Sequence, residues 1–160
     1  MKRLFVLFSL CGILITSCQA QDKKEEKQTA STVTKDTKVI PEYLTQEAFR
    51  QKVFDYMNTK DFKYLGDKPC VIDIYAVWCG PCKRLAPVLE ELAGEYAGKV
   101  QFYKVDAEKE TQLSSALGIR SYPTLLFITK GKKPIIVEGA YPKEELKQII
   151  QTNLLDTAKK

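Results

Sequence analysis

Two cysteines, Cys79 and Cys82, stand three positions apart in the stretch "DIYAVWCGPC", which begins at Asp73. Cysteines at this spacing can form a structural disulfide, contribute to a metal site, or act as a dithiol that exchanges disulfides with other proteins. A disulfide across so short a loop removes little entropy from the unfolded chain, so it would stabilise the fold weakly. A structural zinc site needs four ligands, but the chain has no histidine and the folded part adds only Cys70. These observations favour a working dithiol.

The sequence around the two cysteines supplies a mechanism for such a dithiol. The continuous apolar run "CVIDIYAV" predicts a strand buried on both faces, and the pattern over 79–96 predicts a helix directly after it. Cys79 would then begin the helix, where free backbone N–H groups and the helix dipole favour a thiolate and lower the thiol pKa. Cys82 would lie one turn further on, within reach of Cys79. Pro81 suits a first helical turn, and Gly80 leaves the approach to the sulfurs open.

The elements that must position this pair follow from the rest of the pattern. Strands are predicted for "VQFYKV", "TLLFIT" and "PIIVEG", a short helix for "TQLSSALG", and a last helix over 142–155. Another amphipathic helix is predicted to begin near Thr45. Its apolar positions are Phe49, Val53, Tyr56 and Met57. The order of these elements predicts an α/β fold, with a central mixed β-sheet flanked by helices on both faces.

The stretch "WCGPC" following "VIDIYA" resembles the active site of the thioredoxin family. The likeness extends over roughly 110 residues, from Tyr43 to Leu155, and includes several separated motifs. It implies a thioredoxin fold and a thioredoxin-like domain over residues 41–160. The matching positions outside the cysteine motif are Asp73, Pro87, Lys104, Pro123 in "GIRSYPT", Gly131 and Gly139.

The resemblance also implies roles for particular residues. Cys79 would attack a target disulfide, and Cys82 would then resolve the mixed disulfide. Asp73, buried on its strand, should have a raised pKa and accept the proton of Cys82, with Lys104 tuning it. Pro123 is expected to follow a cis peptide bond, so that an extended substrate can pair with the neighbouring backbone. The residues expected to bind substrate are Trp78, Gly80, Pro81, Tyr122, Pro123 and Gly139. No metal and no other cofactor is expected.

The N-terminus predicts export and attachment to a membrane. "MKRLFVLFSLCGILITSC" begins with two cations and continues with an apolar run too short to span a bilayer comfortably, the pattern of a secretory signal peptide over residues 1–17. Its end resembles a bacterial lipobox, which implies cleavage before Cys18 and lipidation of that cysteine. Residues 18–40 are mostly polar and contain no aromatic side chain, so a disordered tether is predicted. Gln19 after the cysteine favours the outer over the inner membrane, with the domain facing the periplasm.

The composition of the chain excludes some classes of partner. The chain has 160 residues and a formal net charge of +5, too small and too scattered to indicate nucleic-acid binding. Disulfide-bonded envelope proteins are the expected substrates of a monomeric protein-disulfide reductase. Because the envelope lacks the cytosolic reducing system, a DsbD-like membrane electron donor would have to supply its electrons. Two alternatives stay open: a disulfide-donating oxidant of the same fold, and a non-catalytic module that binds unfolded proteins through the surface around Trp78.

Overall fold

The computed structural model describes residues 39–156 of the chain. The predicted signal peptide, the lipidation site Cys18 and the tether up to residue 38 lie outside the described residues. Within the described part, none of the helices combines the length and the apolar character needed to cross a membrane.

A five-stranded mixed sheet forms the centre of the fold, in the order β1-β3-β2-β4-β5. Strands β1 and β2 both run parallel to β3, whereas β4 is antiparallel to β2 and β5 is antiparallel to β4. The predicted mixed sheet is therefore confirmed. Strand β1 was not predicted, because its two residues are too few to form a recognisable sequence pattern. The strands are β1 (Glu42–Tyr43), β2 (Cys70–Tyr75), β3 (Gln101–Asp106), β4 (Thr124–Ile128) and β5 (Ile135–Glu138).

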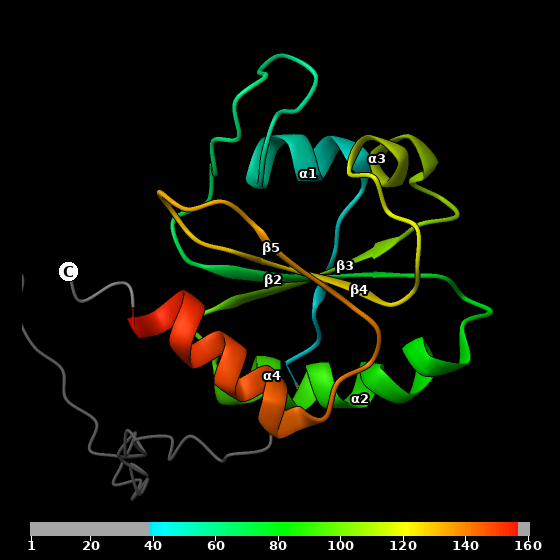
Figure 1. The fold of residues 1–160 in the computed structure, drawn as a ribbon, viewed down its shortest axis with the longest axis vertical. Coiled ribbons are helices and arrows are strands. Elements are labelled where there is room, and N and C mark those ends of the chain that lie inside the picture. The colour runs from blue at the N-terminus through cyan, green and yellow to red at the C-terminus, as the bar shows by residue number, and fades with distance from the viewer. Residues whose placement is uncertain (1–38, 157–160) are drawn as a thin grey trace, which may run out of the picture. The chain divides into compact units, whose positions relative to one another are not determined.

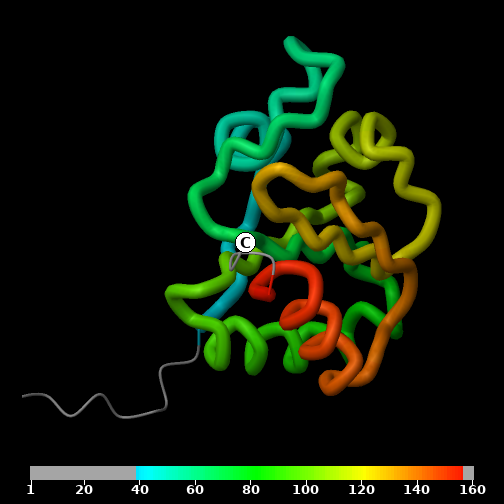
Figure 2. The backbone as a smooth tube through the Cα atoms, turned by 60° about the vertical axis from the view of Figure 1, so that its left-hand side comes forward, coloured from blue at the N-terminus to red at the C-terminus, as the bar shows by residue number. Residues whose placement is uncertain are grey.

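Helices cover both faces of the sheet, as predicted. Helices α1 (Gln46–Lys52) and α3 (Thr111–Ala116) lie on one face, and α2 (Gly80–Glu95) and α4 (Lys143–Ile150) lie on the other (Figure 1). The chain continues from α4 into a turn of π-helix, Gln151–Leu155. The backbone trace shows the last helix packed alongside α2 (Figure 2).

Each face of the sheet has its own apolar core, and β2 contributes to both. Ile72 and Ile74 pack with Phe49 beneath α1 and α3, whereas Val71 packs with Leu89 beneath α2 and α4. Successive side chains of a strand point to opposite faces, so a strand covered on both sides must be apolar almost throughout. This explains why the run "CVIDIYAV" carries a single charged residue, and that residue belongs to the site described below.

Helix α1 is shorter than the apolar pattern predicts. It ends at Lys52, and Met57, predicted on its buried face, is 61% exposed. The cause is Asp55, whose carboxylate accepts hydrogen bonds from Arg50 Nε (2.8 Å) and from Asn58 Nδ2 (2.6 Å). Short polar side chains that bind nearby groups in this way compete with the helical backbone pattern and favour turns. The prediction of Tyr56 and Met57 as helical positions was therefore wrong.

Candidate active site

The two cysteines form a disulfide at the start of α2. Their sulfur atoms are 2.13 Å apart, and their Cα atoms are 5.3 Å apart. Cys79 caps the helix, and the backbone N–H of Cys82 donates a hydrogen bond to Cys79 Sγ (3.1 Å). After reduction, the same N–H and the other free N–H groups of the first turn would stabilise a thiolate at Cys79. Gly80 and Pro81 lie exposed between the two buried cysteines.

Asp73 is the buried acid that the sequence predicts. It lies on β2 with 2% of its surface exposed, and its Oδ1 atom has no hydrogen-bond partner among the described residues. Burial penalises the carboxylate and raises the pKa of Asp73 to about 7, although the nearby Lys104 ammonium works in the opposite direction. A carboxyl group with this pKa can both hold and release a proton near neutral pH.

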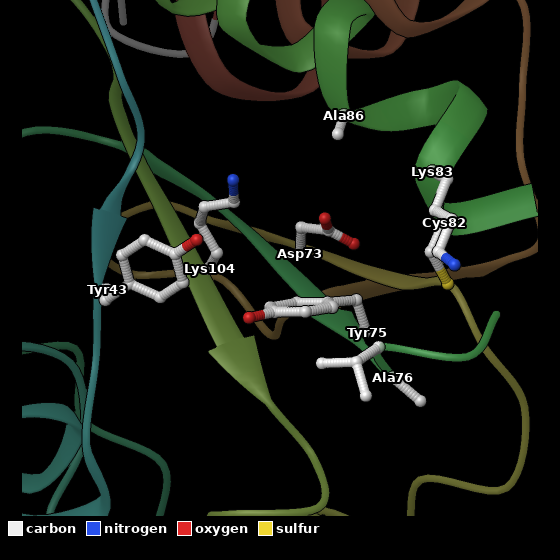
Figure 3. A pocket seen from close by; sticks show the side chains of 9 residues that line it. Tyr43, Asp73, Tyr75, Ala76, Cys82, Lys83, Ala86 and Lys104 are labelled. Atoms are coloured by element: carbon white, nitrogen blue, oxygen red, sulfur yellow. The ribbon is translucent and has the colours of Figure 1, made fainter.

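A cavity of about 280 Å³ connects Asp73 with Cys82 and Lys104. In Figure 3 the Asp73 carboxyl group lies between the Lys104 side chain and Cys82, with the ring of Tyr75 beneath it. Lys104 is the register partner of Asp73 on β3, and its Nζ atom lies 5.1 Å from the centroid of the Tyr43 ring. The cavity is large enough for several water molecules, and the Asp73 oxygen supplies a polar partner for one. Cys82 and the Asp73 carboxyl group therefore share one cavity.

The loop opposite the disulfide holds Tyr122 and Pro123. The peptide bond between them is cis, as the resemblance implies, and the Pro123 carbonyl accepts a hydrogen bond from the Gly139 N–H (2.7 Å). Tyr122 packs against the cluster formed by the two cysteines. The backbone N–H and C=O of Tyr122 make no hydrogen bond within residues 39–156. An extended peptide could therefore pair with this backbone as an added strand.

Trp78 forms the exposed wall of the site. The residue is 66% exposed, and its indole ring stands edge-on to the Tyr122 ring, with the ring centroids 5.9 Å apart. Its Nε1 donates a hydrogen bond to Glu108 Oε1 (3.1 Å), which holds the ring in place. The structure thus brings the predicted residues together: the cysteine motif, Tyr122 with Pro123, and Gly139, which is hydrogen-bonded to Pro123.

The sequence pattern did not predict two polar partners of the site. Tyr43 lines the cavity from β1, a strand too short to leave a pattern. Glu108 follows the end of β3, which runs parallel to β2. Because the carboxyl ends of parallel strands lie at one edge of a sheet, polar residues just after β3 could have been expected near the dithiol.

A protein-family model described as thioredoxin matches residues 41–152 of the chain. The chain belongs to the thioredoxin family. It is 47% identical to a thioredoxin of Borreliella burgdorferi over 108 residues, which is 68% of this chain and 92% of that protein. It is also 39% identical to thioredoxin 1 of Nostoc over 111 residues, covering 69% and 94% of the two chains.

The fold agrees with a solved thioredoxin structure. The crystal structure of a chloroplastic thioredoxin z matches with a TM-score of 0.59 and 30% identity, over 70% of this chain and 92% of that one. Thioredoxins are disulfide oxidoreductases that act on disulfide-containing proteins. The present thioredoxin is accordingly a redox enzyme with a cysteine pair at disulfide distance.

Proposed function

We propose that this thioredoxin is a protein-disulfide reductase of the bacterial cell envelope. The observation that carries the proposal is the Cys79–Cys82 pair at the N-terminus of α2, above the buried carboxyl group of Asp73. The Gly-Pro pair between the cysteines resembles that of reducing thioredoxins and supports the reducing direction. Export and attachment through Cys18 are supported by the sequence of the first 18 residues.

The reaction transfers two electrons from the dithiol to a target disulfide. The Cys79 thiolate attacks one target sulfur, so that a bond forms between Cys79 and the target while the other target sulfur leaves as a thiolate. Cys82 loses its proton and attacks Cys79 Sγ. This second exchange closes the Cys79–Cys82 disulfide and releases the second target sulfur, which leaves the target reduced and the enzyme oxidised. A membrane electron donor then returns two electrons to the pair.

Asp73 is the proposed acceptor of the Cys82 proton. Asp73 lines the cavity that Cys82 also lines, and its pKa of about 7 allows it to take up and return a proton. Lys104 is proposed to favour the ionised form of Asp73 from the neighbouring strand. Removal of the Lys104 ammonium should therefore raise the pKa of Asp73 further.

Substrates are proposed to dock on the face around the cis bond. The free backbone of Tyr122 would pair with an extended segment of the target, and Trp78 would cover one side of the attacked disulfide. Gly139 has a φ of 99° and presents no side chain, which keeps the approach to Pro123 open. Gly80 and Pro81 complete the face beside the cysteines.

The test is a trapping experiment combined with an insulin-reduction assay. With Cys82→Ser, mixed disulfides through Cys79 should accumulate in cells, because the resolving thiol is gone. Cys79→Ala should abolish insulin reduction. If the protein instead acts as a module that merely binds unfolded proteins, Cys79→Ala should leave its function, the binding of those proteins, intact. Absence of any mixed disulfide with Cys82→Ser would remove Cys79 as the attacking residue.

The direction of electron flow needs its own measurement. Acid trapping and alkylation in cells should find Cys79 and Cys82 mostly reduced if a membrane donor supplies electrons. A mostly oxidised pair, together with a reduction potential near that of a dedicated oxidant (about −120 mV against about −270 mV for a reducing thioredoxin), would instead indicate disulfide donation.

A further inference from the structure

The Glu138 carboxylate is held beside the proposed docking face, at the end of β5. Glu138 is the register partner of Thr124, the residue that follows Pro123. Its Oε2 atom accepts a hydrogen bond from Ser121 Oγ (2.8 Å), and the Ser121 carbonyl accepts one from Thr124 Oγ1 (2.7 Å). These bonds join the Glu138 side chain to the loop that carries the cis bond.

The same contacts place this carboxylate close to the attacked disulfide. Ser121 directly precedes Tyr122, whose ring packs against the two cysteines. Gly139, the residue after Glu138, donates its N–H to the Pro123 carbonyl. A substrate segment that pairs with the Tyr122 backbone would therefore run past Glu138 within a few residues of its own cysteine.

The charge of Glu138 is available to a partner. The side chain is exposed, and within residues 39–156 no lysine or arginine nitrogen lies within 4.0 Å of it. Arg120, the nearest cation along the loop, makes no ion pair there. Some other carboxylates of the described domain are ion-paired: Asp55 is bound to Arg50, and Glu95 to Lys143 and Lys147. A serine hydroxyl orients the Glu138 carboxylate without neutralising it.

We propose that Glu138 is a specificity-determining residue, which selects target disulfides with a lysine or arginine close to the attacked cysteine. Ser121 is a positioning residue that holds the carboxylate toward the substrate. The inference rests on the proposed docking at Tyr122, and it adds a substrate class: cationic segments of disulfide-bonded proteins. An exposed ion pair of this kind changes a rate constant by about two- to fivefold, and added salt weakens it.

The experiment uses three disulfide-bonded peptides. They differ only in the residue beside the attacked cysteine, which is Lys in one peptide, Gln in the second and Glu in the third. The second-order rate constant for oxidation of the pre-reduced full-length protein is measured with each peptide. The wild type should react about two- to fivefold faster with the Lys peptide than with the Gln peptide, and slowest with the Glu peptide. The preference should shrink at 0.5 M salt.

Variants separate the carboxylate from the overall charge. Glu138→Gln should bring the ratio of the rate constants for the Lys and Gln peptides close to one. Glu138→Lys should make the Glu peptide react fastest. Ser121→Ala should reduce the ratio of the Lys to the Gln rate constant. Asp67→Asn is the matched control, because it also removes one negative charge but lies before β2, at the end of that strand remote from the dithiol. It should leave the ratio unchanged.

The outcomes distinguish the inference from the proposed function. Equal rates for the three peptides, or a Lys preference that survives Glu138→Gln, would overturn the role of Glu138 while disulfide reduction itself stands. If none of the peptides oxidises the wild-type dithiol, the proposed function and the role of Glu138 are both overturned.

Discussion

Replacing Asp73 by asparagine should remove most of the pH dependence that this residue gives to the stability of the protein. Asp73 is 2% exposed, and burial raises its pKa from 3.8 to about 7. Asparagine has nearly the same shape and cannot ionise. Any constant cost of burying the amide, about 1–3 kcal/mol if it stays unbonded, is the same at every pH. The pH-dependent part of the difference between the two proteins therefore reports on the carboxyl group.

The sign and the size follow from proton linkage. Between pH 3.8 and 7 the folded protein holds the Asp73 proton and the unfolded chain has lost it. The folded state thus binds more protons, and the free energy of unfolding falls as the pH rises through this window. A shift of about three pKa units corresponds to about 4 kcal/mol. The free energy of unfolding of Asp73→Asn, measured relative to that of the wild type, should therefore rise by about 4 kcal/mol between pH 4 and pH 8. Above pH 8 this difference should change little.

Urea unfolding of the oxidised proteins at several pH values measures this difference. Keeping the disulfide closed removes any contribution from titration of Cys79 and Cys82, and equal slopes with denaturant confirm that both proteins unfold alike. Asp67→Asn serves as the control, because it makes the same change from carboxylate to amide at a side chain that is 98% exposed. A constant difference between wild type and Asp73→Asn from pH 4 to pH 8 would refute the raised pKa.

Three further predictions concern single residues. Phe49→Ala should lower the free energy of unfolding by about 3–5 kcal/mol in urea titrations, because Phe49 is 1% exposed in the core beneath α1. Cys70 should resist alkylation at pH 8 in the native protein and react after denaturation, as mass spectrometry can show, since burial raises the pKa of its thiol to about 12. Gly139→Ala should cost about 1–2 kcal/mol of stability in the same titrations, because its φ of 99° strains any residue with a Cβ atom. A fully stable Gly139→Ala would contradict the backbone argument.

Much of the fold could be predicted because its signals are local. The apolar run of β2 and the spacing of apolar residues in α2 identify both elements without reference to the rest of the chain. The end of α1 could not be predicted in this way. The pattern continues through Met57, but the hydrogen bonds of Asp55 turn the chain first. A polar contact between neighbouring side chains outweighed a periodic apolar pattern there.

The sequence by itself determines which groups can do the chemistry: a cysteine pair at the start of a helix, one acid on an apolar strand, and no histidine. Only the tertiary structure decides their surroundings. The cavity shared by Asp73 and Cys82 is built from β1, β2, β3 and α2, and the contact of Glu138 with Ser121 joins residues 17 positions apart. Burial, pKa and charge placement depend on which elements pack together, and that packing is a property of the whole chain.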